Sequence, residues 1–207
     1  MQAERRFTSH AAHELRTPIA GIRAQAEVAR DGRDPAARGL ALDQVIEGCD
    51  RAARLVDQML LLARIDERTA LGPPPETRLD QVAARVIADL APAALEQDVA
   101  IELATDDPVT AAVDGALLEV LLRNLVDNAV RHGRGPGAVT VRCCARAGAA
   151  VLEVADRGPG VTDDELAQLG RRFYRAPAAQ GPGSGLGLSI VQRIAESCGG
   201  SAHYRHG

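Results

Sequence analysis

Apolar residues near the start of the chain recur at alternating steps of four and three. The series consists of Leu15, Ile19, Ile22, Ala26 and Ala29. Heptad spacing of this kind predicts a helix that packs against another helix. The segment 31–35, Asp-Gly-Arg-Asp-Pro, consists of turn-forming residues and ends the pattern.

A second helix is predicted after this turn, and it carries two apolar stripes. The first stripe contains Leu42, Val45, Cys49, Ala52, Val56, Met59 and Ala63, and the second contains Ile46, Ala53 and Leu60. Two stripes exceed what one hairpin partner covers, so we expect two hairpins to pack as a four-helix bundle in a homodimer. The alternative is that the second stripe packs on the domain that follows.

The proline run at residues 73–75 marks a change of pattern. We expect a helical hairpin at 1–70, a semi-stiff linker at 71–77 and a second domain at 78–207. In that domain the pattern predicts helices at 79–95, 115–131 and 186–197, and strands at 99–103, 109–113, 139–143 and 151–156. Strands and helices do not alternate regularly, which favours an α+β fold, an α/β sandwich with a mixed sheet, over a doubly wound sheet.

Composition excludes several classes of function. The formal net charge is −4, the sequence pI is about 5.7 and no basic block stands out, so nucleic acid is not expected as a direct partner. The four cysteines show no metal-binding spacing and are expected to be reduced thiols. The sequence has no run of about eighteen apolar residues, so no membrane span is expected within it.

The segment 13–18, His-Glu-Leu-Arg-Thr-Pro, holds the first candidate chemistry. Neutral imidazole has a free ring nitrogen, so His13 can act as a nucleophile while Glu14 accepts the proton on the other nitrogen. Thr17 lies four residues after His13 and so on the same helix face. Pro18 inside a helix costs about 3 kcal/mol or more and opens the turn before it. The alternative, a helix that starts at Pro18, is disfavoured because the apolar series runs through it.

The helix predicted at 115–131 carries two amides on an otherwise apolar stretch. Asn124 and Asn128 are four residues apart, and Arg131 and His132 follow at the helix end. A buried amide without a partner costs about 1–3 kcal/mol, so these side chains need partners. The partners are either backbone groups or, as a functional site, Mg²⁺ and phosphates.

Three further segments, each weak alone, carry features of a nucleotide site. Asp156 ends a strand and can accept from the amine of adenine, while Gly158 and Gly160 let the backbone approach the ring. Segment 171–175 combines aromatic side chains, including Phe173, with positive charge. Segment 183–187, Gly-Ser-Gly-Leu-Gly, opens the last helix and can present N–H groups to phosphates.

These motifs resemble those of a known family. Segment 13–18 resembles the H-box of sensor histidine kinases, and the later features, in their order, resemble the N, G1, F and G2 boxes of the Bergerat (GHKL) ATP-binding domain. The resemblance spans about residues 7–200. It implies that His13 takes the γ-phosphoryl group of ATP, with Glu14 as base, and donates it to an aspartate in the receiver domain of a response regulator. His10 is a second acceptor candidate, but no glutamate follows it.

The resemblance also implies a set of binding residues for ATP and Mg²⁺. Asn128 is expected to hold the metal, Asp156 to recognise adenine, and Arg175, on a mobile lid between Gly160 and Gly183, to reach the γ-phosphate. The expected cofactor-binding set is Asn124, Asn128, Arg131, His132, Asp156, Gly158, Gly160, Phe173, Arg175, Gly183, Gly185, Leu186 and Gly187. For Thr17 the resemblance implies help in dephosphorylating the regulator, and the alternative is a bond to the His13 carbonyl.

Two other activities compete with the kinase. Related ATPases of the gyrase or MutL kind place a water-activating glutamate where this chain has Asn124, and a nucleotide-binding scaffold would not need His13 and Glu14. The family adds a strand hairpin after Gly200; residues 201–204 could begin it, but the sequence given ends at residue 207, so the last strand is expected to be missing. We expect the chain to be the cytoplasmic portion of a bacterial inner-membrane protein, with membrane contact only through N-terminal segments outside this sequence.

Overall fold

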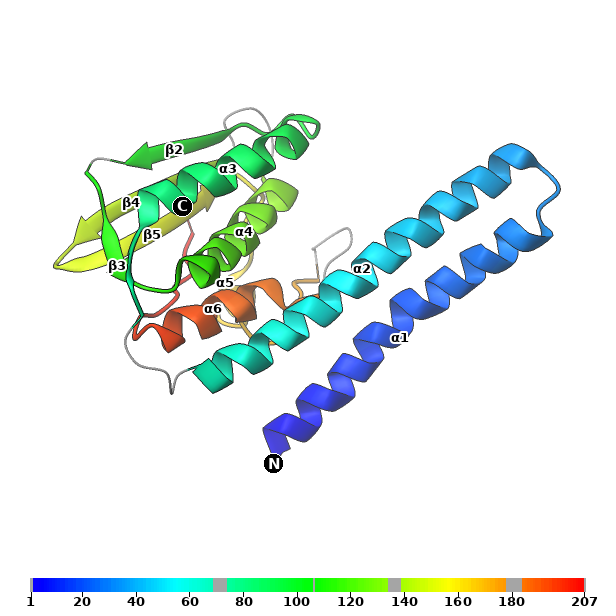
Figure 1. Ribbon diagram of the computed structural model, residues 1–207, viewed down its shortest axis with the longest axis horizontal. Coiled ribbons are helices and arrows are strands. Elements are labelled where there is room, and N and C mark those ends of the chain that lie inside the picture. The colour runs from blue at the N-terminus through cyan, green and yellow to red at the C-terminus, as the bar shows by residue number, and fades with distance from the viewer. Residues whose placement is uncertain (1, 69–73, 106, 134–138, 178–183, 207) are drawn as a thin grey trace. The chain divides into compact units, whose positions relative to one another are not determined.

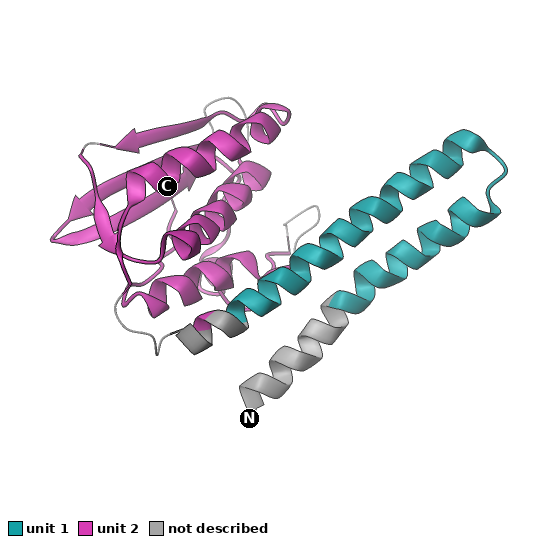
Figure 2. Ribbon diagram, in the orientation of Figure 1, with its two compact units in different colours: residues 1–64 teal, residues 65–207 magenta. Residues whose placement is uncertain are grey.

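The structure is a computed structural model that describes residues 2–68, 74–105, 107–133, 139–177 and 184–206. The chain divides into two compact units, residues 1–64 and residues 65–207 (Figure 2). No helix in the described ranges combines the length and the apolar character needed to cross a membrane.

The first unit is an antiparallel helical hairpin. Helix α1 spans Gln2–Asp31 and contains Pro18, as predicted, and helix α2 spans Pro35–Arg68 (Figure 1). At the turn, the Gly32 N–H donates to the Val28 carbonyl at 2.9 Å and the Ala36 N–H donates to Asp34 Oδ1 at 3.1 Å. Both bonds satisfy backbone groups that the helix ends leave without partners inside the helix.

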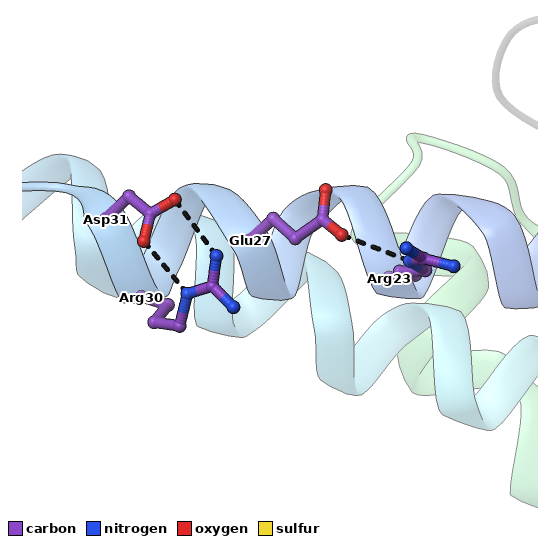
Figure 3. A network of polar contacts seen from close by, with 4 residues as sticks. All are labelled: Arg23, Glu27, Arg30 and Asp31. Carbon is purple, nitrogen blue, oxygen red and sulfur yellow. Dashed lines mark hydrogen bonds and ion pairs between the residues drawn. The ribbon is translucent and has the colours of Figure 1, made fainter.

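Ion pairs line the end of α1 that leads into the turn (Figure 3). Arg23 Nε donates to Glu27 Oε1 at 3.0 Å, one turn along the helix, and Arg30 Nε donates to Asp31 Oδ1 at 2.9 Å. The bond from Arg30 lowers the pKa of the Asp31 carboxyl, and the same bond raises the pKa of Arg30. All four side chains are exposed, so they mark a solvated stretch of the helix.

The buried face of α2 coincides with the first predicted stripe only in part: it keeps Val45, Ala52 and Met59 but uses the positions just before Leu42, Cys49 and Val56. From position 41 to position 55, the buried or partly buried residues of α2 are Ala41, Val45, Gly48, Ala52 and Leu55. Further along, they are Gln58, Met59, Leu61, Leu62 and Ile65. Gly48 lies on the α1 side, because a Cβ built on it would be 2.6 Å from Ile22 Cγ1. Leu42, Cys49 and Val56 are exposed and continue the second stripe rather than the first. The sequence pattern missed this phase because the contact uses small residues, alanine and glycine.

The second unit is an α/β fold with a mixed sheet. Its strands are β1 (Glu76–Arg78), β2 (Ile101–Thr105), β3 (Thr110–Ala112), β4 (Val139–Arg146) and β5 (Ala149–Asp156). Strand β4 is central, parallel to β2 and antiparallel to β5, and β1 pairs with β3 in a separate antiparallel ribbon. The predicted linker 71–77 therefore ends inside a strand, while its residues 71–73 lie outside the described ranges.

Helices α3 (Leu79–Leu95) and α4 (Gly115–His132) pack on the three-stranded sheet, and α6 (Gly187–Ser197) packs on α4 (Figure 1). Asp114 fixes the start of α4, because its Oδ1 accepts from the Ala116 N–H at 2.8 Å. The largest fully buried side chains of this core include Leu122, Val126, Val139, Val141 and Ile190. Aromatic residues make up only 2% of the sequence, and the residues of this core are accordingly aliphatic.

Residues 201–206 do not form a strand. Tyr204 instead donates its hydroxyl to the Leu188 carbonyl at 3.1 Å, and Arg205 forms an ion pair with Glu153 on β5. Burial raises the pKa of Tyr204 to about 12. The end of the described chain is thus fastened to α6 and β5 by side chains rather than by a ladder of backbone bonds.

Candidate nucleotide site and phosphoacceptor helix

The segment 13–18 lies inside α1, well away from both ends of that helix. The backbone places positions 13 and 17 on one face, one turn apart. Thr17 is exposed and Pro18 is partly buried. The side chains of His13 and Glu14 lie outside the described part of the structure, so their predicted roles stay predictions.

Helix α4 and the start of α6 meet at Asn124. Asn124 Nδ2 donates to the Val120 carbonyl at 2.8 Å, which is the backbone role considered for this amide. Its Oδ1 would lie 2.9 Å from a Cβ built on Gly187, the first residue of α6. Only a glycine leaves room for this approach, so the amide of the N-box position and the N-terminus of α6 lie together.

The C-terminal end of α4 meets the turn after β5. The Gly158 N–H donates to Asp156 Oδ1 at 2.8 Å, which makes the turn that the sequence pattern suggests. A Cβ on Gly158 would lie only 2.4 Å from the His132 carbonyl oxygen, so this glycine packs directly against the end of α4. Gly160, with φ of +70°, continues the turn in a conformation that favours glycine.

A backbone hydrogen bond joins the segments around Phe173 and Gly185. The Phe173 N–H donates to the Gly185 carbonyl at 2.9 Å, and both residues have positive φ, +64° and +66°. A Cβ on Gly185 would lie 2.7 Å from the Phe173 carbonyl carbon. Phe173 is half-buried and Arg175 is exposed, while Gly183 lies outside the described residues.

Two separate segments, the turn after β5 and the start of α6, therefore contact helix α4. Asn124, Asn128 and His132 lie at steps of four along one face, with Gly187 beside the first and Gly158 beside the last. A helix N-terminus at one end suits phosphates, and the Asp156 carboxylate at the other suits an amine. Amide oxygens beside phosphates also fit the hard-oxygen preference of Mg²⁺. No cluster of three or more His, Cys, Asp or Glu able to hold a metal occurs among the described residues.

Both parts of the chain match domains of known protein families. Residues 3–68 match the His Kinase A (phospho-acceptor) domain, and residues 113–207 match the histidine kinase-, DNA gyrase B- and HSP90-like ATPases. Sensor protein QseC of Escherichia coli (strain K12) is 43% identical over 198 residues, which cover 95% of this chain and 43% of QseC. The chain belongs to the sensor histidine kinases. It spans less than half the length of the curated relatives it matches.

Other sensor kinases are similar in sequence or in fold. Sensor protein kinase PmrB of Pseudomonas aeruginosa is 42% identical over 197 residues, covering 95% of this chain and 41% of PmrB. The Acinetobacter baumannii histidine kinase AdeS has a TM-score of 0.67 at 23% identity, with 89% of this chain and 86% of that chain covered. Full-length ShkA in complex with AMPPNP has a TM-score of 0.62 at 28% identity, with 95% and 41% covered. The predicted fold class is confirmed.

The structure adds detail at two residues of the 183–187 segment of this sensor kinase, Leu186 and Ser184. The Leu186 side chain is fully buried, so it is a core residue and can offer a nucleotide only its backbone. Ser184 was not predicted, although its Oγ accepts from the Leu186 N–H at 3.3 Å and so supports the start of α6. A serine that bonds to the N–H two residues later, just before a helix, is a common signal, and it was available in the sequence.

Proposed function

We propose that this chain is the catalytic core of its sensor kinase and transfers the γ-phosphoryl group of Mg-ATP to His13. The observation that carries the proposal is that the N segment on α4 contacts the G1 segment at Gly158 and the G2 segment at Gly187, while the F segment bonds to the G2 segment. The α1 helix of the same chain contains the H-box. The unit that holds these segments would bind the nucleotide, and the hairpin would supply the acceptor. The ATP-binding family match supports the first half and the phospho-acceptor match the second.

Each binding residue has a separate task in this proposal. Asp156 accepts from the exocyclic amine of adenine, and Gly158 and Gly160 let the turn lie close to the ring. The N–H groups at the start of α6 face the phosphates. Asn128 offers its amide oxygen to Mg²⁺, which would neutralise phosphate charge as the phosphoryl group leaves.

The transfer itself needs two residues of α1. A ring nitrogen of His13 forms a bond to the γ-phosphorus while the bond from that phosphorus to the bridging oxygen of ADP breaks. Glu14 takes the proton from the other ring nitrogen, which keeps the imidazole nucleophilic. In the second step an aspartate carboxylate of a response regulator attacks the phosphorus, and the bond to His13 breaks.

A homodimer is part of the proposal, and an exposed seam on α2 supports it. The seam consists of Leu42, Ile46, Cys49, Ala53, Val56 and Leu60, at alternating steps of four and three. Ile46 is 60% exposed and Leu60 is 51% exposed, so large apolar side chains face solvent in the single chain. A second hairpin would cover them in a four-helix bundle.

The gyrase-type ATPase alternative is not favoured by the geometry at Asn124. An amide cannot accept a proton from water as a glutamate does, and this one already donates to the Val120 carbonyl. Residues 3–68 also match a phospho-acceptor domain, and an enzyme that only hydrolyses ATP does not need such a domain. The curated relatives are more than twice as long as this chain, so we propose that membrane anchoring and signal sensing belong to segments outside it.

The test is to incubate the chain with γ-labelled ATP and to map the phosphorylated residue. We expect label on His13, and we expect His13→Gln to abolish labelling while ATP affinity stays unchanged, because the acceptor and the nucleotide residues lie in different units. His10→Gln is the matched control and should label normally. Label that persists in His13→Gln, or ATP binding lost in that variant, would contradict the proposal.

A further inference from the structure

Tyr204 lies outside the segments assigned to the nucleotide site but is in contact with two of them. It belongs to the segment 201–206, which follows α6 and forms neither a helix nor a strand. Its hydroxyl donates to the Leu188 carbonyl at 3.1 Å. Burial raises the pKa of Tyr204 to about 12, so at neutral pH the hydroxyl keeps the proton that it donates. The bond therefore links this segment to α6 throughout the ordinary pH range.

The acceptor of this bond lies in the first turn of α6, which begins at Gly187. The N–H groups of this turn are the ones that we propose to face the phosphates. The Leu188 carbonyl has two lone pairs, so it can accept from Tyr204 and also from the helical N–H four residues later. Gly187 is approached closely by Asn124 of α4. Two consecutive residues of the first turn are thus held by side chains from two other parts of the unit.

The ring of Tyr204 packs on Gly170, directly before the segment 171–175. A Cβ built on Gly170 would lie 3.2 Å from Tyr204 Cε2 and 3.4 Å from the Tyr204 hydroxyl oxygen. Gly170 has φ of +82°, a conformation that favours glycine. Further along the same segment, the Phe173 N–H donates to the Gly185 carbonyl. The segment 171–175 is therefore held by Tyr204 at its start and by the glycine loop in its middle.

The adenine end of the proposed site is held by other contacts. The Gly158 N–H donates to Asp156 Oδ1, and Gly158 packs against the His132 carbonyl at the C-terminal end of α4. These contacts use no atom of Tyr204. A change at the Tyr204 hydroxyl should therefore act on the phosphate end and leave the adenine end in place.

We propose that Tyr204 is a positioning residue of the nucleotide site and sets how tightly the phosphates of ATP are bound. Its hydroxyl acts through the Leu188 carbonyl on the first turn of α6, and its ring acts through Gly170 on the segment 171–175. Binding to donors that are already held in place costs less than binding to donors that must first be ordered. The inference rests on the proposed function and adds to it a residue from outside the motif segments.

The experiment compares Mg-ATP with adenosine, which lacks the phosphates, in calorimetric titrations of the whole chain. Tyr204→Phe keeps the ring and removes only the hydroxyl. We expect its affinity for ATP to fall by roughly threefold to tenfold, the scale of one hydrogen bond, while its affinity for adenosine stays unchanged. Tyr204→Leu also removes the ring and should weaken ATP binding further.

Ser197→Ala is the matched control. Ser197 Oγ donates to the Ile194 carbonyl at 2.8 Å, so this variant loses the same kind of bond at the other end of α6. It should bind ATP and adenosine as the native chain does. An equal loss of ATP affinity in Ser197→Ala and Tyr204→Phe would show that any weakening of α6 has this effect, and would overturn the inference.

Two results for Tyr204→Phe would also overturn the inference. Unchanged ATP affinity would show that the hydroxyl does not position the phosphate end, and parallel losses for ATP and adenosine would show a general structural role. The native chain tests the proposed function separately. If the native chain binds no ATP, the proposed function and this inference both fail, whereas equal ATP affinity in the native chain and Tyr204→Phe contradicts this inference alone.

Discussion

Asn124 directs the two ends of its amide to different neighbours. The nitrogen donates to the Val120 carbonyl, and this bond orients the oxygen toward the first residue of α6. Gly187 is in contact because it has no Cβ. The pair therefore sets the spacing between α4 and the helix N-terminus that we propose for the phosphates.

Gly187→Ala tests this spacing. The added Cβ would lie 2.9 Å from Asn124 Oδ1, so the amide or the start of α6 must move. We expect ATP affinity, measured by calorimetry, to fall about tenfold, the lower part of the usual cost of overpacking. Gly21→Ala is the control, because a Cβ there meets nothing within 4 Å, and it should bind ATP normally. Wild-type affinity in Gly187→Ala would place the phosphates elsewhere.

A substitution at Thr17 distinguishes a kinase that only phosphorylates its regulator from one that also dephosphorylates it. It is exposed on α1 and lies one turn after His13, so its hydroxyl can reach whatever docks on that face. We expect Thr17→Ala to keep autophosphorylation and transfer, in which Glu14 is the base, and to lose dephosphorylation of the regulator. Both rates are to be measured on one purified variant with its cognate regulator. Parallel losses of both would favour a structural role, a bond to the carbonyl one turn earlier.

The elements show what the sequence pattern can predict and where it fails. The heptad steps and the apolar runs predicted both long helices and the helices of the second unit to within one or two residues at most ends. Strand β1 was missed because Glu76, Thr77 and Arg78 are short and polar, and pairing with β3 is what makes them a strand. The burial of the Leu186 side chain was not foreseen, because a glycine-rich motif does not indicate which side chain turns into the core.

Gly48 illustrates the same limit in α2. A glycine in mid-helix reads as a weak point, since it costs up to about 1 kcal/mol relative to alanine. The structure shows a close contact with Ile22 that no larger residue permits. Sequence spacing alone cannot distinguish a tolerated glycine from a required one.

Two alanine substitutions in α2 test this distinction. Gly48→Ala would place a Cβ 2.6 Å from Ile22 Cγ1, a stiff β-branched side chain, whereas a Cβ at Gly39 meets nothing within 4 Å. We expect Gly48→Ala to destabilise the hairpin by about 1–3 kcal/mol. Gly39→Ala should be neutral or stabilising by up to about 1 kcal/mol. Thermal unfolding followed by circular dichroism measures both, and equal shifts would contradict the close contact.

At the scale of the whole molecule, the question is what covers the seam on α2. The described hairpin leaves large apolar side chains exposed along the seam, and exposed apolar surface of this extent is a common mark of an interface. Cys49 lies in the middle of the seam and is exposed in the single chain. A homodimer that covers the seam should therefore also hide this thiol.

Ile46→Glu tests the dimer through two independent readouts. A charge in the middle of a bundle seam is strongly unfavourable when buried, so we expect the variant to be monomeric by light scattering after size exclusion. Alkylation of Cys49, followed by mass spectrometry, should be slow in the native chain and fast in Ile46→Glu. Cys143 is an internal reference, because it is buried and burial raises its pKa to about 11, so it should stay unmodified in both.

Leu40→Glu is the matched control: Leu40 is 64% exposed on α2 but lies outside the seam, so this variant should stay dimeric with Cys49 protected. A native chain that is monomeric, or a Cys49 that reacts equally fast in all three proteins, would show that the seam is covered by something other than a second copy.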